Sequence, residues 1–338
     1  MTPVSKPAIR RRLTAPEYVE GILACDRVIL ARAITLMESD LDSDQELAAE
    51  VLDGCLPHTG RSRRVGVAGV PGAGKSTFLD ALGMHLIVDR GERVAVLSVD
   101  PSSPISGGSI LGDKTRMERL AAQERAFIRP SASRGHLGGV ARRTRECMLL
   151  AEAAGFQNVL IETVGVGQSE TALRTMTDTF LLLLIPGAGD ELQGMKRGIL
   201  EMTDLLAINK ADGDNRERAA QAQRAYEFGF HLFSTPADGW HPRVMTCSAL
   251  TGESIPAVWE VVLSHEAHTT ANGAREARRR QQALEWMRSQ IQEQLESEFR
   301  RHPAVRAAMP AMEQHVRDGL WSPSHAARRL LALFHRKD

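Results

Sequence analysis

The chain of 338 residues carries 42 Lys or Arg and 42 Asp or Glu, so its formal net charge at pH 7 is zero. This length supports one large or two modest domains without disulfides, and the neutral balance excludes a global field directed at nucleic acid or a membrane. The four cysteines lie far apart with no C-x-x-C pair, which favours a reducing compartment and argues against a thiolate metal site. The longest apolar run, FLLLLI at 180–185, is too short to span a membrane, and no apolar core follows the charged first residues, so we expect a cytoplasmic protein.

Three regions follow one another along the chain. Residues 1–58 have apolar side chains at helical spacing and predict a small helical region. Residues 59–266 alternate short apolar runs with amphipathic stretches, which predicts an α/β domain with a mostly parallel, doubly wound sheet. Residues 267–338 predict helices outside the sheet, so helical extensions flank the α/β domain on both sides. The predicted strands are RRVGVAGV, RVAVLSVD, NVLIETVG, FLLLLIPG, DLLAINKAD and RVMTCSAL.

Two local signals concern the last region. Pro303, Pro310 and Pro323 are expected to break its helices. The run REARRRQQ at 275–282 predicts a solvated helix stripe, with a basic face for an acidic partner as the alternative.

One short stretch, GVPGAGKST, carries the first chemical signal. It matches the pattern G-x-x-x-x-G-K-[ST], whose backbone N–H groups wrap a chain of phosphates, at Gly69, Gly74, Lys75 and Ser76. Because a predicted strand precedes the loop and a predicted helix follows it, the phosphates would meet a helix N-terminus, which favours anions. Lys75 would neutralise the β and γ phosphates, and the Ser76 hydroxyl would bind magnesium. The stretch predicts a P-loop NTPase; the alternative is a glycine-rich turn with an incidental lysine.

A second motif, NKAD at 209–212, indicates the base. It follows the apolar run DLLAI and so leaves a strand at the sheet edge that also carries the phosphate loop. A carboxylate at Asp212 can accept two hydrogen bonds from guanine, whereas adenine offers neither, and the stem of Lys210 can cover the base. Residues 248–250, after the run RVMTC, can offer backbone N–H groups to the guanine oxygen. Together these motifs predict GTP, although NKAD alone would also fit a turn in which Asp212 caps a helix.

Acidic residues follow two further predicted strands. Glu162 begins an E-x-x-G stretch where many GTPases carry D-x-x-G, and it can hold magnesium directly or through water, or else cap the next helix. Val166 occupies the place of the water-orienting glutamine of Ras-like enzymes, so we expect slow intrinsic hydrolysis that a partner stimulates. Asp100 and Asp113 flank a long Ser-, Pro- and Gly-rich loop, and their carboxylates could reach the metal side of the nucleotide or serve as caps.

Six segments resemble the MeaB and ArgK family of P-loop GTPases: GVPGAGKST, VDPSSPISGGSILGDKTRM, RGHLGGVARRT, IETVGVGQSE, PGAGDELQGMKRGI and NKAD. The resemblance covers essentially the whole chain. It implies a homodimeric, GTP-hydrolysing chaperone that gates the loading of adenosylcobalamin onto methylmalonyl-CoA mutase and protects that enzyme during turnover. The implied cofactors are GTP or GDP and Mg²⁺, and residues 267–338 would form the dimerisation region.

The resemblance also assigns roles to single residues. The implied phosphate and magnesium cradle comprises Gly69, Val70, Pro71, Gly72, Ala73, Gly74, Lys75, Ser76 and Thr77, and the implied guanine pocket comprises Asn209, Lys210, Asp212, Ser248, Ala249 and Leu250. The implied catalytic residues are Lys75, Glu162 and Asp100, and the residues around magnesium are Ser76, Asp100, Asp113 and Glu162. Residues 185–196 resemble the family's additional switch. If DELQGMK is a helix, its side chains form one stripe at Asp190, Gln193 and Lys196. This stripe could serve a partner, or it could be a solvated polar face.

Three other functions stay open. A nickel-inserting GTPase would show a His-rich tract or a C-x-x-C site, and this sequence has neither. A kinase of an amino-acid transport system would transfer the phosphoryl group to protein rather than to water. A binding module with a purely structural nucleotide would not turn GTP over.

Overall fold

The structure is a computed structural model, and it describes residues 11–39, 41–99, 117–129, 137–163, 169–187, 197–231 and 238–335. The chain divides into two compact units, Met1–Arg280 and Gln281–Asp338. The first unit contains the sheet and the second contains the last helices.

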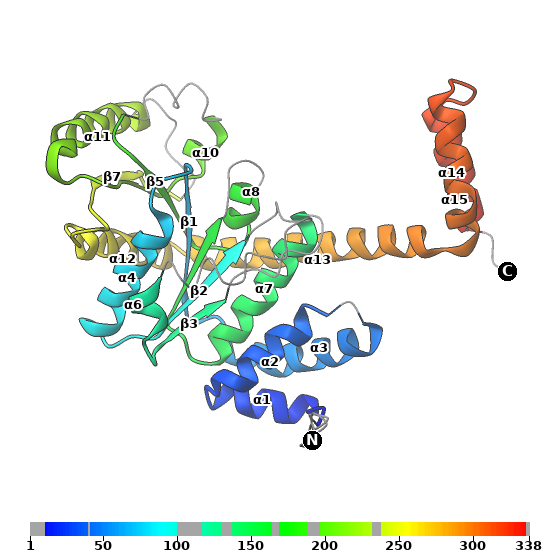
Figure 1. Ribbon diagram of the computed structural model, residues 1–338, viewed down its shortest axis with the longest axis horizontal. Coiled ribbons are helices and arrows are strands. Elements are labelled where there is room, and N and C mark those ends of the chain that lie inside the picture. The colour runs from blue at the N-terminus through cyan, green and yellow to red at the C-terminus, as the bar shows by residue number, and fades with distance from the viewer. Residues whose placement is uncertain are drawn as a thin grey trace, which may run out of the picture. The chain divides into compact units, whose positions relative to one another are not determined.

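Among the described residues, seven parallel strands form one sheet at the centre of the first unit (Figure 1). They are β1 (Arg63–Gly69), β2 (Val94–Val99), β3 (Ala126–Arg129), β4 (Asn158–Thr163), β5 (Thr179–Leu184), β6 (Leu205–Ile208) and β7 (Arg243–Thr246). Their order is β3-β2-β4-β1-β5-β6-β7, and every neighbouring pair is parallel. The central strands are buried almost throughout, as a parallel sheet covered on both faces requires. The predicted doubly wound α/β fold is confirmed.

Helices pack on both faces of this sheet. On one face α4 (Lys75–Val88) contacts β1 and β2, and α12 (Ile255–Ala271) contacts α4, β5 and β6. On the other face α7 (Leu137–Ala153) contacts β2 and β4, and α8 (Ser169–Arg174) contacts β1, β4 and β5. Right-handed connections between parallel strands account for the positions of α4, α7 and α8, because the chain crosses the sheet in one direction from β1 to β3 and in the other from β3 to β7. The remaining elements of this region are α6 (Glu118–Ala121), α10 (Arg197–Glu201), η3 (Gly213–Asn215) and α11 (Arg216–His231).

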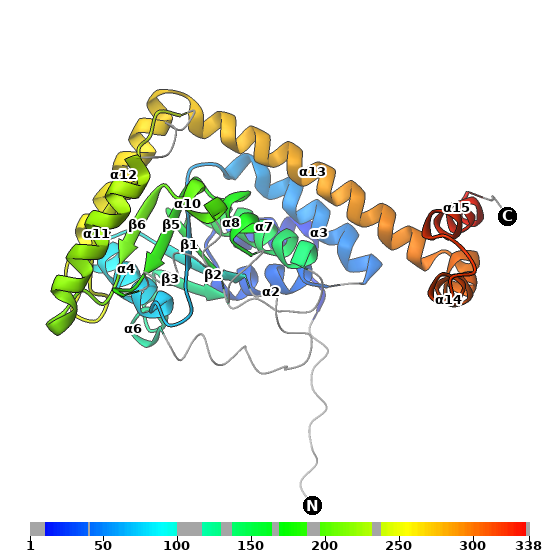
Figure 2. The same cartoon turned by 90° about the horizontal axis from the view of Figure 1, so that it is seen from above.

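The N-terminal region is helical, as predicted, and packs against α7 (Figure 2). Its elements are α1 (Ala15–Leu23), α2 (Arg27–Met37), α3 (Asp42–Cys55) and the short turn η1 (Leu56–His58). A capping box starts α1, where the N–H of Thr14 donates to Glu17 Oε2 at 2.8 Å. Asp26 starts α2 by accepting hydrogen bonds from the first backbone N–H groups of that helix. Ile22, Leu30 and Ile34 are fully buried, so these helices share the core of the first unit.

The arginines of REARRRQQ begin α13 (Ala274–Arg301), and the predicted solvated stripe is wrong for three of them, since Arg278 donates to Asp238 Oδ2 at 2.8 Å and two others are also held. Arg279 donates to both carboxylate oxygens of Asp178, at 2.8 and 2.6 Å, and to Ser62 O at 2.7 Å. Arg275 donates to the same Ser62 oxygen at 3.0 Å. Asp178 also accepts a hydrogen bond from the N–H of Arg64 at 3.2 Å. The first turns of α13 are therefore fixed to the starts of β1 and β5.

The described part of the second unit is helical. It contains the rest of α13, then α14 (Pro303–Arg317) and α15 (Pro323–Phe334), which pack against each other. Phe334 packs edge-on against Phe299, with ring centroids 5.5 Å apart. Pro303 and Pro323 start their helices, as predicted for breaks, but α14 continues through Pro310, so the break predicted there is wrong. The helix gives up one backbone hydrogen bond at that proline.

Candidate functional site

The sequence motifs meet at one edge of the sheet. The phosphate loop follows β1, NKAD follows β6, and residues 248–250 follow β7, while Glu162 lies near the end of β4. Because all of these strands are parallel, their carboxyl ends share one edge, which is where open α/β sheets bind ligands.

The phosphate loop has a shape that requires glycine at three positions. Gly72 and Gly74 have φ of +77° and +84°, in the left-handed region. A Cβ on Gly69 would lie 2.3 Å from a carbonyl oxygen of β5, and one on Gly74 would lie 2.8 Å from Nδ2 of Asn209. The loop ends where α4 begins at Lys75, so a ligand in it meets a helix N-terminus, as predicted.

Lys75 lies inside this loop. Its Nζ donates to Gly69 O at 2.8 Å and to Val70 O at 3.5 Å. Burial lowers the pKa of Lys75, and the negative charges of Glu162 and Glu170 act in the opposite direction. The amine thus lies within electrostatic reach of two carboxylates, and it can exchange its bonds to loop carbonyls for bonds to a phosphate.

Asn209 connects the phosphate loop to the loop after β7. Its Nδ2 donates to Ala73 O at 2.8 Å, and its Oδ1 accepts from the N–H of Ala249 at 2.9 Å. All three residues are buried. We call Ala73, Asn209 and Ala249 the asparagine bridge. It ties the predicted phosphate loop to the loop of the predicted guanine pocket.

Asp212 does not act as a helix cap. It stands before η3 but makes no side-chain bond to that helix, so the alternative reading of NKAD is wrong. Its Oδ2 accepts a hydrogen bond from the Ser248 hydroxyl, and that hydroxyl accepts one from the N–H of Thr251 at 3.2 Å. Within the part of the chain that the structure describes, Oδ1 of Asp212 has no donor. The loop after β7 thus orients a carboxylate that can still accept hydrogen bonds.

Lys210, two residues before Asp212, and Leu250, two residues after Ser248, are both exposed. Lys210 has φ of +60°, which is rare for a residue with a side chain and common at functional sites. The N–H groups of Ser248 and Ala249 are both bonded within the protein, whereas that of Leu250 has no acceptor among the described residues. Of the three backbone N–H groups predicted to face the guanine oxygen, that of Leu250 is therefore the one that can still donate a hydrogen bond to a ligand.

Glu162 is buried, with 2% of its surface exposed. Its Oε1 accepts a hydrogen bond from Ser98 Oγ at 3.0 Å, because the register of β2 and β4 sets the two residues side by side. Ser76 and Thr77 lie in the first turn of α4. The remaining site predictions lie outside the described residues and stay predictions: Asp100, Asp113, Val166, Asp190, Gln193 and Lys196.

Comparison with known proteins identifies the family. The family model described as Methylmalonyl Co-A mutase-associated GTPase MeaB matches residues 30–304. The chain belongs to this family. It is 54% identical over 313 residues to a putative GTPase of Caulobacter vibrioides, and the aligned residues cover 93% of this chain and 95% of the relative. It is 50% identical over 282 residues to GTPase ArgK of Escherichia coli, and the aligned residues cover 83% of this chain and 85% of the relative.

Two further matches extend over most of the chain. A protein of Mus musculus named methylmalonic aciduria type A homolog, mitochondrial, is 44% identical over 324 residues, which cover 93% of this chain and 78% of the relative. The crystal structure named LAO/AO transport system kinase has a TM-score of 0.76 and 38% identity, and covers 97% of this chain and 100% of that one. The resemblance seen in the motifs is confirmed, and the chain is a P-loop GTPase of the MeaB and ArgK family.

The described residues contain no helix with the length and apolar character to cross a membrane. They also contain no group of three or more His, Cys, Asp or Glu side chains placed to hold a metal ion.

Proposed function

We propose that this chain is a GTP-dependent chaperone that gates the loading of adenosylcobalamin onto methylmalonyl-CoA mutase and protects that enzyme during turnover in the cytoplasm. The family description names the mutase, and the mouse relative is named for methylmalonic aciduria. The observation that supports the nucleotide half of the proposal is the asparagine bridge, since it joins the loop proposed to bind phosphate to the loop proposed to bind guanine. Family membership carries the mutase half.

Among the described residues, one group would bind the phosphates of GTP and another would bind its guanine base. Lys75 would exchange its bond to Gly69 O for bonds to the β and γ phosphates, placing positive charge where negative charge develops in the transition state. The N–H groups at the start of α4 would hold the phosphates. Asp212 would accept hydrogen bonds from the guanine edge, and the N–H of Leu250 would donate to the guanine oxygen.

Magnesium fits the oxygen donors of the site. Ser76 supplies a hydroxyl in the first turn of α4, and Glu162 supplies a buried carboxylate oriented by Ser98. Such oxygens are the ligands that Mg²⁺ prefers, and the bound ion would neutralise charge on the β and γ phosphate oxygens. The proposed members outside the described residues are Asp100 and Asp113 for the metal, and Asp190, Gln193 and Lys196 for the partner.

The second unit supports a homodimer. An apolar stripe on α13 is about half exposed and falls within about 80° around the helix axis; its members are Leu284, Met287, Ile291 and Leu295. A second copy would cover such a stripe through a symmetric contact. Ile291→Glu should convert the dimer to a monomer in sedimentation equilibrium, whereas Ser289→Glu, on the opposite face of α13, should not. A dimer that survives Ile291→Glu would exclude the stripe as the interface.

Single-turnover GTP hydrolysis, with and without purified mutase, tests the chaperone function. We expect slow hydrolysis by the chain alone, because Val166 replaces a water-orienting glutamine, and faster hydrolysis with the mutase. Glu162→Ala should remove the acceleration. An unchanged wild-type rate would reject coupling to the mutase and leave GTP binding intact. Equal acceleration of wild type and Lys196→Ala would reject only the role of Lys196.

A kinase of an amino-acid transport system is the second candidate, since the crystal structure of that name covers 97% of this chain. The two functions differ in the group that accepts the phosphoryl group. With GTP labelled at its γ phosphate, the chaperone releases labelled inorganic phosphate, whereas the kinase transfers the label to a protein.

A further inference from the structure

The N-terminal helices carry a charge that the rest of the chain balances. Residues 14–58 contain ten Asp or Glu and two Arg, a net charge of −8 in a chain whose total is zero. On α3, Glu46, Glu50 and Asp53 follow one another at spacings of four and three residues and so share one face. None of the three forms an ion pair with another described residue. Like charges at this spacing destabilise a helix, and the surface they form attracts cations and repels nucleic acid and anionic lipid.

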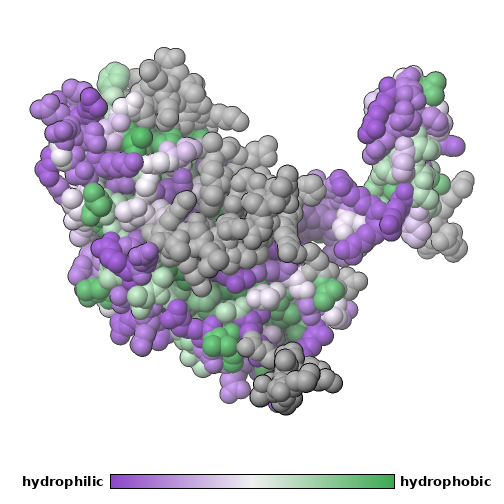
Figure 3. Space-filling view, viewed as in Figure 1, coloured by the Kyte–Doolittle hydropathy of each residue, from purple (hydrophilic) through white to green (hydrophobic). Residues whose placement is uncertain are grey.

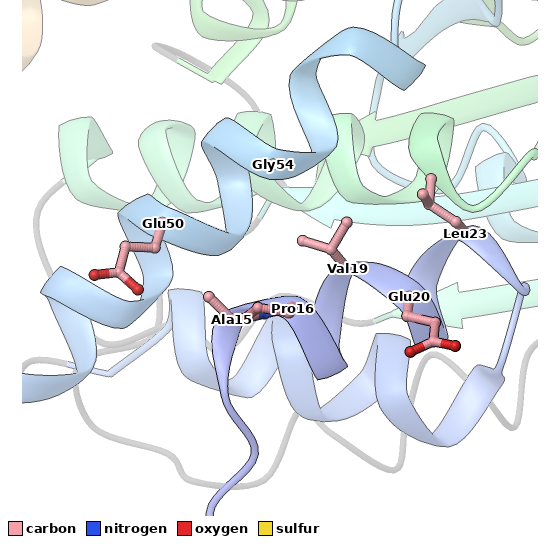
Figure 4. A pocket seen from close by; sticks show the side chains of 7 residues that line it. All are labelled: Ala15, Pro16, Val19, Glu20, Leu23, Glu50 and Gly54. Carbon is pink, nitrogen blue, oxygen red and sulfur yellow. The ribbon is translucent and has the colours of Figure 1, made fainter.

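An apolar groove of about 600 Å³ lies between α1 and α3 (Figure 4). Val19 points from α1 toward α3, and Leu23 stands at one end of the groove (Figure 4). Glu20 and Glu50 belong to its lining and bring carboxylates to its rim. Leu23 is 39% exposed, and Figure 3 shows apolar surface, in green, over these N-terminal helices. The groove therefore combines an apolar floor with an acidic rim.

Gly54 sets the shape of the groove from the side of α3. A glycine inside a helix destabilises it by about 1 kcal/mol relative to alanine. A Cβ on Gly54 would lie 2.7 Å from Cγ2 of Val19, so any side chain there would displace Val19 or fill the groove. The acidic face and the glycine both weaken α3, and each contributes one residue to the lining of the groove, Glu50 and Gly54. Local features that oppose stability are expected at binding surfaces.

We propose that this groove binds a basic amphipathic helix of a partner protein. A helix with Leu or Ile at i, i+4 and i+7 would set its apolar ridge against Val19 and Leu23, and flanking Lys or Arg would meet Glu20 and Glu50. The apolar ridge of the partner helix supplies affinity. The exposed charges are screened by salt, and they select basic partners over acidic ones. None of the lining residues belongs to the nucleotide site, so the inference is independent of the proposed function.

Selection from a library of helical peptides against the full chain, with counter-selection against Gly54→Leu, tests this inference. The enriched peptides should carry an apolar ridge flanked by Lys or Arg. Combining Glu20→Lys with Glu50→Lys should weaken an enriched peptide about tenfold in calorimetry, since two exposed charge contacts are worth about 1.4 kcal/mol together.

Matched controls exist on α11. Glu217→Lys with Glu227→Lys makes the same change of charge at exposed positions there and should leave peptide binding unchanged. Gly229→Leu replaces a helical glycine whose Cβ would meet open space, and it should also leave binding unchanged. If Gly54→Leu does not fold, Leu23→Lys serves in its place because Leu23 is partly exposed.

Four results would overturn the inference. One is a selection that enriches no peptide, or enriches acidic or uncharged ones. Another is equal binding of an enriched peptide to wild type and to the variant with both Glu20→Lys and Glu50→Lys. A third is a change in the sedimentation of the chain alone on Gly54→Leu, which would make the groove an interface between copies. The last is competition by a synthetic peptide of residues 1–10, which would assign the groove to this chain.

Discussion

Replacing Asn209 by alanine should uncouple the phosphate loop from the guanine loop while leaving the other contacts of both in place. The change removes the 2.8 Å bond to Ala73 O and the 2.9 Å bond from the N–H of Ala249, and leaves two buried backbone groups without partners. Because each of these two unsatisfied buried groups costs about 1–3 kcal/mol, the free energy of unfolding should fall by about 2–6 kcal/mol. Because one nucleotide spans both loops, the affinity for GDP should fall about 10- to 100-fold.

Calorimetry with GDP and unfolding by denaturant measure these two losses separately. Asn158→Ala is the matched control, because Asn158 is also buried and donates through Nδ2, at 2.7 Å to Glu92, but lies at the amino end of β4. The control should lose stability and keep its GDP affinity. If Asn209→Ala behaves in the same way, the asparagine bridge has no role in nucleotide binding.

Asp212→Asn should weaken GDP binding by about 1.5–3 kcal/mol, because a charged acceptor is lost, and xanthine nucleotides should gain relative to guanine; calorimetry with both nucleotides checks this. Lys75→Ala should abolish single-turnover hydrolysis while circular dichroism shows an intact fold. Burial would raise the pKa of Asp178, but the hydrogen bond and charge of Arg279 hold it below its ordinary value. A lowered pKa stabilises the folded state above the unfolded pKa of about 3.9, and this contribution is lost as pH falls through the folded pKa. The difference in unfolding free energy between wild type and Asp178→Asn should therefore be constant near neutral pH and shrink in acid, and a difference independent of pH would contradict the charge pairing.

The fold and most of the described site could be predicted because each motif directly follows its own strand. Local spacing then defines the chemistry, and parallel pairing brings the strand ends together. β3 was missed because it has four residues, AFIR, and pairs only with β2 within the described sheet, so its pattern is too short to recognise. Ser98 was missed for another reason. Its partner Glu162 is 64 residues away, and only the register of β2 and β4 joins them.

The arginines at the start of α13 show why a charge run is a weak guide to surface. Arg279 and Arg300 lie on the same helix, but Arg279 pairs with Asp178, 101 residues away and buried, whereas Arg300 pairs with Glu296 one turn back, with about 60% of both side chains exposed. Removing one partner of a buried pair costs about 3–5 kcal/mol, and an exposed pair contributes at most about 1 kcal/mol. Asp178 also accepts from the N–H of Arg64 in β1, the strand whose other end forms the phosphate loop. Arg279 therefore supports the strand that leads to the phosphate loop, and Arg300 does not, because the two arginines differ in burial and in the position of their partners. The charge run in the sequence contains neither kind of information.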